Sequence, residues 1–462
     1  MVLTSNSSAK PAKHFKRKPS GGNDEASTSG DAWKPGLGSR MAAVKILSAV
    51  LEKKTSLDGM MDAENGNPTY RALNVADRAL VRAIVNTALR HLPRIDAALG
   101  MLLDGPLPQG ARSLHHVLVV GATQMLYLDV PDHSAVDLAV EQAHRDPRNR
   151  RFVKLVNAVL RRLGREKDDV LQAVSAIPVL PEWFYKRLSK VYGADAAERM
   201  AQAQLIPSVI DITVKSNPEQ WASKLGGTVM PNGSVRLGSF EGSVSGLEGF
   251  DDGEWWVQDF SASIPVRLMG DLTGKRVVDA CAAPGGKTAQ LILSGAKVTA
   301  LDQSGNRLKR LRENLRRLKL EAETIESNML KFQPEELFDA VLLDAPCSST
   351  GTLRKHPDVC WTKDERDIAK LAGLQEQMLR HASTFVKSGG LVVFSNCSLD
   401  PSEGEEMVAK VLASSPDLER IPVSAQDFPG MEHAVNADGD LRTTPDMFGG
   451  VDGFYAAVLR KR

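Results

Sequence analysis

The second half of the chain repeats one local pattern, in which a short apolar run leads into a glycine- or proline-containing turn and then into a helical segment. After Trp256 the successive runs read RVVDACAAPGGKTAQLIL, KVTALD followed by NRLKRLRENLRRLKL, AVLLDAPC, and GLVVFSNCS. Alternating strands and helices predict a parallel sheet with helices on its faces. We therefore expect an α/β domain with a mostly parallel sheet over residues 251–462.

The remainder of the 462 residues suffices for further domains, at about 150 residues each. Residues 1–38 are rich in Ser, Gly, Lys, Pro and Asn and contain few large apolar side chains, which predicts a disordered tail. Apolar residues at helical spacing over residues 39–166 predict an all-α bundle. Short strand and helix patterns over residues 167–250 predict a small α+β linker domain.

The overall charge says little about partners, because the 58 Lys and Arg residues are nearly balanced by 57 Asp and Glu residues. Any nucleic acid must therefore be bound by local patches. The end of the predicted bundle is one such place, with Arg145, Arg148, Arg150, Arg151, Lys154, Arg161, Arg162 and Arg165. An RNA-binding surface and an ordinary solvated helix face remain equal alternatives for this patch. For the basic residues of the tail, and for those of the helix after Asp302, solvation is the simpler interpretation.

The four cysteines include no C-x-x-C pair and no histidine spacing that suits zinc, so we expect neither a disulfide framework nor a metal site. The N-terminus lacks an apolar signal segment. No apolar run approaches the roughly 18 residues of a membrane span. These features predict a soluble, cytoplasmic protein without a membrane partner.

The turn Asp279–Thr288 follows the first strand of the predicted α/β domain, where open parallel sheets bind their ligands. Pro284 stiffens the turn, while Gly285 and Gly286 lack the Cβ atoms that would block a close approach of the backbone. The next strand ends in Asp302, near the spacing at which an acidic residue binds ribose hydroxyls.

Three classes of nucleotide cofactor compete for this turn. A Walker A loop requires a glycine where Cys281 stands, although Gly286-Lys287-Thr288 matches its second half. The dinucleotide fingerprint G-x-G-x-x-G is also absent. A turn with an acid for ribose but no diphosphate cradle favours S-adenosyl-L-methionine over ATP or NAD.

Cys347 and Cys397 stand at the ends of two later strands, in AVLLDAPC and LVVFSNCS. A cysteine at one strand end is most often a small buried apolar residue. Two of them on neighbouring loops beside a cofactor turn instead indicate covalent catalysis. Asp344 lies on the first of these loops, where its carboxylate could bond a base edge.

These motifs resemble those of a known enzyme family. CAAPGGKT, DAPCSSTG, RKHPDVCW, SNCSLDPSEGEE and DGFYAAVLRK are similar to successive motifs of RNA cytosine-5 methyltransferases of the RsmB, Sun or Fmu type. GATQMLYLDVPDHSA and KLVNAVLRRL resemble the NusB-like RNA-binding domain of that branch. The resemblance runs from about residue 40 to the end. It implies a NusB-like helical domain at 39–166 and a Rossmann-like class I methyltransferase domain at 251–462.

The resemblance also implies roles for four residues. Cytosine C5 is a weak nucleophile, so a thiolate adds at C6 and pushes electron density onto C5. The family pattern assigns this attack to Cys397, and assigns removal of the C5 proton and product release to Cys347. Asp344 is expected to hold the N3 side of the base, with Lys287 assisting. The target base must leave its stack to reach the thiolate.

The same resemblance implies the cofactor contacts. The expected residues are Cys281, Ala282, Ala283, Pro284, Gly285, Gly286, Lys287, Asp302, Asn328 and Asp344. Cys281 would act through its backbone. Three positions depart from the family pattern: Asn396 replaces the usual Thr, Asn328 replaces an Asp at the adenine end, and Cys360 replaces a common Lys.

The expected activity is thus methyl transfer from S-adenosyl-L-methionine to C5 of a cytosine in small-subunit ribosomal RNA, by a protein expected to be a monomer. One alternative is the same chemistry on another RNA, such as transfer RNA. A second is a non-catalytic RNA-binding assembly factor with a vestigial methyltransferase fold. A P-loop ATPase is disfavoured by Cys281.

Overall fold

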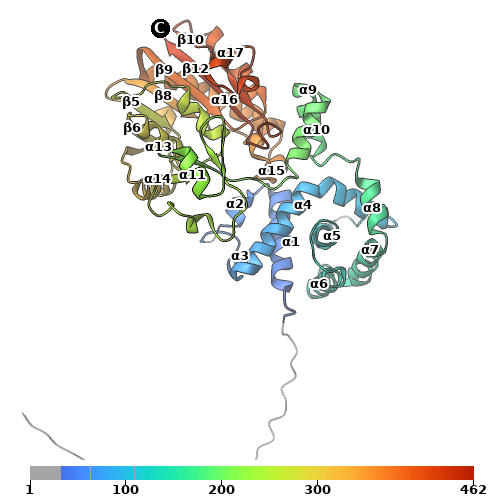
Figure 1. The fold of residues 1–462 in the computed structure, drawn as a ribbon. Coiled ribbons are helices and arrows are strands. Elements are labelled where there is room, and N and C mark those ends of the chain that lie inside the picture. Colours follow the sequence, from blue (N-terminus) through green and yellow to red (C-terminus); the bar gives the residue numbers. More distant parts are fainter. Residues whose placement is uncertain (1–32, 63, 109) are drawn as a thin grey trace, which may run out of the picture. The chain divides into compact units, whose positions relative to one another are not determined.

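The computed structural model describes residues 33–62, 64–108 and 110–462, and residues Gly36–Arg462 form one compact unit (Figure 1). Residues 1–32 of the predicted tail lie outside the described residues. The first helix starts at Leu37, inside the predicted tail. None of the helices in the described ranges is both long and apolar enough to cross a membrane.

The first part of this unit is helical, as the 3.6-residue spacing of its apolar side chains predicts. Its elements are α1 (Leu37–Lys53), α2 (Leu57–Met60), α3 (Pro68–Arg71), α4 (Val75–Leu102), α5 (Arg112–Tyr127), α6 (Asp132–Arg145), η1 (Arg150–Phe152), α7 (Val153–Arg165) and α8 (Lys167–Val174). Asn74 caps α4 by accepting a hydrogen bond from Asp77 N at 2.8 Å. Ile84, Leu118 and Leu160 come from three of these helices and meet, fully buried, in one core.

The middle of the chain contains both helices and strands. Helices α9 (Glu182–Tyr192) and α10 (Ala194–Ala203) precede an antiparallel sheet of order β2-β3-β1-β4. The strands of this sheet are β1 (Asp211–Val214), β2 (Thr228–Val229), β3 (Val235–Arg236) and β4 (Trp255–Val257). Between them lie α11 (Pro218–Lys224) and η2 (Val244–Gly246). The sheet extends past residue 250, the expected end of the linker domain, because Thr213 pairs with Trp256.

The C-terminal part is built on an eight-stranded sheet, whose main path is β10-β12-β9-β8-β5-β6-β7. The strands are β5 (Arg276–Ala280), β6 (Lys297–Asp302), β7 (Glu323–Glu326), β8 (Phe338–Asp344), β9 (Val386–Asn396), β10 (Leu418–Arg420), β11 (Leu441–Thr443) and β12 (Phe454–Lys461). Strands β5 to β9 pair in parallel, whereas β10, β11 and β12 pair antiparallel. The expected mostly parallel sheet is therefore confirmed.

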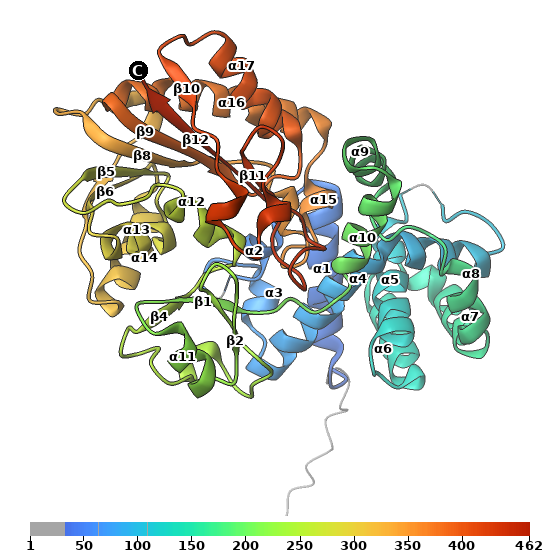
Figure 2. The same cartoon turned by 45° about the horizontal axis from the view of Figure 1, so that its top comes forward.

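Helices cover both faces of this sheet (Figure 2). They are α12 (Ile264–Arg267), α13 (Gly286–Leu293), α14 (Gly305–Arg317), α16 (Glu365–Ala382) and α17 (Glu405–Ala413). The short α15 (Val359–Thr362) lies beside α1 instead (Figure 2). Alternate residues of β8 reach opposite faces. Val341 packs in a core with Leu379 of α16, whereas Leu342 packs in another with Leu291 of α13. This two-sided burial explains why the strands are continuous apolar runs.

Candidate active site

Four strand ends meet at one edge of the large sheet. Parallel pairing places Ala280 beside Leu301 and Leu343, and Asp344 beside Ser395, so the turns after β5, β6, β8 and β9 leave the sheet side by side. A cavity of about 440 Å³ opens at this edge. Its lining includes Cys281, Ala283, Lys287, Asp302, Asn328, Asp344, Cys347 and Cys397 from the residues that the sequence singled out.

Cys347 and Cys397 face each other in this cavity. Their Sγ atoms lie 3.5 Å apart, although the residues are 50 positions apart in the chain. The sulfur of Cys397, and then burial, raise the pKa of the Cys347 thiol well above its ordinary value. Cys347 is therefore a thiol in the resting site, and its high pKa makes its sulfur a strong base once that proton has passed to another group.

Lys287 and Asp344 form an ion pair beside the two sulfurs. Lys287 Nζ donates to Asp344 Oδ2 at 2.8 Å, and Ser395 Oγ donates to Asp344 Oδ1 at 3.0 Å. Burial lowers the pKa of Lys287, but the opposing effect of Asp344 and then Asp279 leaves it raised. The pair therefore supplies a fixed cation and an acceptor carboxylate, which suits recognition of a polar base edge.

Asp302 organises the neighbouring end of the cavity. It is 2% exposed, and its carboxylate accepts hydrogen bonds from Ala283 N at 3.3 Å and Ser304 N at 3.0 Å. Arg307 Nη1 lies 3.0 Å from Asp302 Oδ2, and the same guanidinium donates to Ala283 O. Arg307 was not predicted as a site residue, because the basic residues of its helix were interpreted as solvated.

Protein packing explains the glycines of the turn after β5. Gly285 has φ +103°, and a Cβ atom there would lie 3.0 Å from Leu311 Cγ of α14. A Cβ atom on Gly286 would lie 3.4 Å from Trp256 Nε1. Ala282, Pro284, Gly285 and Gly286 are not among the lining residues of the cavity.

The remaining two cysteines differ from the facing pair. Cys281 lines the cavity, but burial raises the pKa of its thiol to about 12, which argues against a nucleophilic role. Cys360 is buried in an apolar cluster with Phe184 and Leu188 of α9. Burial also raises its pKa, so this position serves packing.

The two asparagines that depart from the family pattern have distinct positions. Asn328 lines the cavity, and its Oδ1 accepts a hydrogen bond from Leu330 N at 2.9 Å at the start of η4 (Met329–Lys331). Asn396 is 1% exposed and lies outside the lining. Its amide bonds Glu403 O at 2.7 Å and Ser398 N at 3.0 Å, so it shapes the loop that carries Cys397.

Sequence reasoning missed other residues of the lining. Phe454 and Asp452 come from the terminal DGFYAAVLRK segment, and the Phe454 ring centroid lies 5.2 Å from Lys287 Nζ. The motif had been noted, but its antiparallel pairing with β9 brings these residues to the site. In the described ranges, no group of three His, Cys, Asp or Glu side chains is arranged to hold a metal ion.

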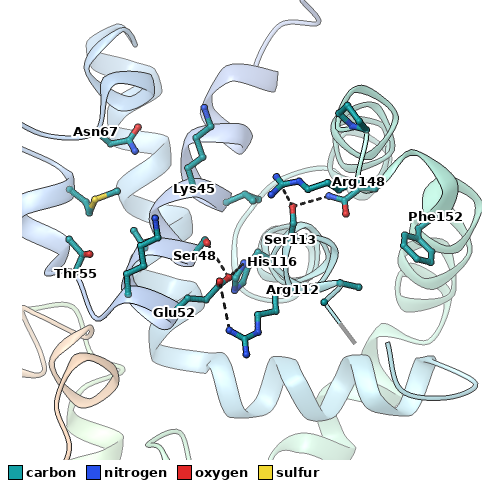
Figure 3. Close-up of a pocket in the computed structure, with 18 of the residues that line it drawn as sticks. Lys45, Ser48, Glu52, Thr55, Asn67, Arg112, Ser113, His116, Arg148 and Phe152 are labelled. Carbon is teal, nitrogen blue, oxygen red and sulfur yellow. Dashed lines mark hydrogen bonds and ion pairs between the residues drawn. The ribbon is translucent and has the colours of Figure 1, made fainter. Parts of the chain in front are cut away.

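A second cavity, of about 980 Å³, lies in the helical domain between α1, the start of α5 and the segment before α7 (Figure 3). We call it the helical groove. Its charged and aromatic lining is Lys45, Glu52, Lys53, Arg112, His116, Arg148, Arg151 and Phe152. Arg112 and Arg148 extend into solvent, with side chains 75% and 76% exposed. Five cations line the groove, of which Arg112 pairs with Glu52 at 3.9 Å and Arg148 with Asp146 at 2.9 Å.

Comparison with known proteins agrees with this architecture. Residues 268–460 match the family of 16S rRNA methyltransferases RsmB/F, and residues 38–165 match the NusB family. The chain is 32% identical to ribosomal RNA small subunit methyltransferase B of Serratia proteamaculans, over 91% of this chain and 98% of the relative. Identity to the protein of the same name from Vibrio vulnificus is 33%, over 92% and 99%.

A solved structure is also similar. The chain is 27% identical to a methyltransferase homolog protein from Pyrococcus horikoshii, covering 60% of this chain and 94% of that one, with a TM-score of 0.52. The sequence matches extend over nearly the whole chain, from the helical bundle to the last strand. The chain therefore belongs to the RsmB/F family of small-subunit ribosomal RNA methyltransferases, with a NusB-family domain ahead of its catalytic domain.

Proposed function

We propose that this protein methylates C5 of a cytosine in small-subunit ribosomal RNA through a covalent adduct between cytosine C6 and Cys397. The observation that supports the proposal most strongly is the 3.5 Å contact between two thiols at the rim of a cofactor-sized cavity. Methylation of ring nitrogens or hydroxyls requires no such pair of cysteines. Cytosine C5 does require a nucleophile at C6 and a base for the C5 proton.

S-adenosyl-L-methionine is the methyl donor of the RsmB/F family, and it supplies an electrophilic methyl group when bound. The residues present fit it. Asp302 offers a buried carboxylate for ribose hydroxyls, and the segment Ser327–Leu330 adds polar and apolar lining for the adenine end. Cys281 and Ala283 also line the cavity, and Ala283 N donates to Asp302.

The proposed reaction begins with attack of the Cys397 sulfur on C6 of the cytosine. The new C–S bond makes C5 nucleophilic, and Asp344 accepts a hydrogen bond from the N3 and N4 side of the base. The Lys287 ammonium holds the Asp344 carboxylate in place at 2.8 Å. After C5 has gained its methyl group, the Cys347 sulfur in its thiolate form takes the C5 proton. The electron pair of the C5–H bond forms the C5=C6 double bond, and the C6–S bond breaks to return Cys397 as a thiolate.

The cofactor cavity alone does not select ribosomal RNA, so we propose that the helical groove binds an RNA segment outside the target base. Its five cations suit phosphates, and the Arg151 guanidinium lies over the Phe152 ring, 4.6 Å from the centroid. The N-terminus of α5 adds a positive dipole end without a side-chain cap. For two residues of the basic patch, Arg148 and Arg151, the proposal favours RNA binding over a solvated helix face.

The groove is tested by substituting Arg112 and Arg148 with glutamine together. We expect weaker binding of small-subunit RNA and a shallower dependence of log K on log salt, by about 0.7 to 0.9 for each lost phosphate contact. The charge-matched control is Lys410→Gln with Arg462→Gln, two exposed cations of the catalytic domain. Equal salt slopes in both double variants would refute the role of the groove.

The reaction is tested by nucleoside mass spectrometry of RNA incubated with the protein and the methyl donor. We expect 5-methylcytidine in small-subunit ribosomal RNA, and none with Cys397→Ala. If 5-methylcytidine forms in transfer RNA alone, the proposed ribosomal substrate is wrong, whereas the proposed reaction stands. No product from any RNA, together with no binding of the donor in calorimetry, would favour a non-catalytic assembly factor.

A further inference from the structure

The 3.5 Å contact between the sulfurs of Cys347 and Cys397 depends on two loops from different strands. In the part of the chain that the structure describes, two backbone hydrogen bonds join these loops near the cysteines. Ala345 N donates to Ser395 O at the end of the strand pairing, and Gly351 N donates to Cys397 O, both at 2.9 Å. The residues between these points must be held by side chains.

Glu403 supplies such a link. It is 0% exposed, and each of its carboxylate oxygens accepts two hydrogen bonds. Oε1 accepts from Ser348 N and Gln375 Nε2, both at 2.9 Å. Oε2 accepts from Ser348 Oγ at 2.5 Å and Ser398 Oγ at 2.6 Å. Because Ser348 follows Cys347 and Ser398 follows Cys397, one carboxylate bonds the immediate neighbours of both thiols.

Burial of the Glu403 carboxylate lowers the stability of the fold, and packing alone does not explain why a charged side chain stands there. No ion pair of Glu403 occurs among the described residues, so its charge is balanced only by hydrogen-bond donors. Burial raises the pKa of Glu403, while the hydroxyls of Ser348 and Ser398 oppose that shift. A carboxylate without a cation is costly to bury unless its oxygens are hydrogen-bonded, and here three of the four donors belong to the residues that follow the two cysteines. A polar clamp beside two reactive sulfurs therefore indicates a functional role.

We propose that Glu403 is a positioning residue, which clamps the loops of Cys347 and Cys397 so that the two sulfurs stay in contact. The catalytic consequence rests on the proposed function of these cysteines. Glu403 lies outside the cavity lining and does not touch substrate, so it acts through Ser348 and Ser398. The Cys397 sulfur and burial contribute most to the raised pKa of Cys347, and the negative charge of Glu403 contributes further.

Four variants separate geometry from charge and supply a control. Glu403→Ala removes all four hydrogen bonds. Glu403→Gln keeps the shape of the side chain and removes the charge, and the rotatable serine hydroxyls can still pair with it. Glu406→Gln is the matched control, because Glu406 is an exposed carboxylate three positions further on. Ser398→Ala removes one donor and provides a milder test if Glu403→Ala does not fold.

The geometry can be measured without any methylation assay, by oxidation with the diazene reagent diamide. The reagent gains two electrons and two protons from two thiols and becomes a hydrazine, and a disulfide forms. In the full-length wild type we expect a Cys347–Cys397 disulfide, mapped by peptide mass spectrometry. Since misplacing reacting atoms by about 1 Å can cost about 100-fold, we expect Glu403→Ala to slow this closure at least about 10-fold.

The other variants provide the remaining comparisons. The Cys347–Cys397 disulfide should form at nearly the wild-type rate in Glu403→Gln and Glu406→Gln, and at an intermediate rate in Ser398→Ala. In Glu403→Gln, alkylation of Cys347 should begin at lower pH, a shift that a purely structural role would not produce. In single-turnover methylation, Glu403→Ala should lower the rate constant and leave the KM for RNA unchanged.

Closure at the wild-type rate in both Glu403→Ala and Ser398→Ala would overturn the clamp. So would an unchanged alkylation profile of Glu403→Gln, combined with unchanged methylation by Glu403→Ala. If closure slows as expected while the wild type forms no 5-methylcytidine, the clamp stands and the proposed function fails. The two hypotheses are therefore tested separately.

Discussion

Replacing Lys287 with methionine removes the cation that faces Asp344. The Lys287 side chain is 11% exposed, and that of Asp344 is 31% exposed. Methionine fills a similar volume, so the change mainly leaves the Asp344 carboxylate with the hydrogen bond from Ser395 Oγ and with Asp279 and Asp302 nearby. The partly buried carboxylate is then uncompensated, and both folding and base recognition should suffer.

The size of the effect follows from this burial. Breaking a fully buried ion pair costs about 3–5 kcal/mol, and the partial exposure of Asp344 reduces our expectation to about 2–3 kcal/mol. For a domain of this size, that loss corresponds to a fall in Tm of about 4–10 °C. Because the folded-state pKa of Lys287 is raised, the stabilisation is complete below the ordinary lysine pKa and disappears as pH rises through the folded value.

The assay is thermal unfolding of the full chain, with Lys387→Met as the matched control. Lys387 pairs with Asp339 at a similar distance of 2.7 Å, but its side chain is 49% exposed. A surface pair of this kind should contribute less than about 1 kcal/mol. Adding Asp344→Asn to Lys287→Met should restore part of the lost stability. The reasoning is refuted if Lys287→Met costs no more than Lys387→Met, or if the second substitution destabilises the protein further.

Two further substitutions test the turn after β5. Burial raises the pKa of Asp279 to about 7 from an unfolded value of 3.8, so between these values the folded state binds a proton that the unfolded state has lost. The free energy of unfolding, measured with urea, should therefore fall by up to about 4 kcal/mol as pH rises, relative to that of Asp279→Asn. Parallel pH profiles of the two proteins would contradict this prediction. Gly285→Ala should lower the free energy of unfolding by about 1–3 kcal/mol more than Gly270→Ala. Both glycines have positive φ, but only a Cβ atom at position 285 would meet Leu311. Equal losses in Tm would contradict this prediction.

The α/β architecture could be predicted because its strands are buried on both faces. Val341 and Leu342 face opposite helical layers, so β8 must be apolar at successive positions. Such runs, separated by helices with one apolar stripe, leave few possible topologies. The antiparallel strands were not predicted. β10 and β11 have only three residues each, and the eight-residue β12 pairs with strands whose identity and direction no local pattern indicates.

The predicted site residues gather at one edge because strand ends fix the start of each turn. Cys347, Cys397, Asp344 and Lys287 meet there for this reason. Contributions that depend on long-range packing could not be predicted. Arg307 bonds Asp302 through the orientation of α14, and Phe454 arrives through pairing of the last strand with β9. Neither position has a local signal that distinguishes it from a solvated cation or a core aromatic residue.

The central claim is that Cys397 attacks the base while Cys347 releases it. The most direct test incubates Cys347→Ala with small-subunit ribosomal RNA and S-adenosyl-L-methionine, followed by denaturing electrophoresis and peptide mass spectrometry of the RNA-linked species. The account predicts a stable protein–RNA adduct attached at Cys397, which is absent when Cys397→Ala is added. An adduct attached at any other residue, or one that persists in the double variant, would contradict the account.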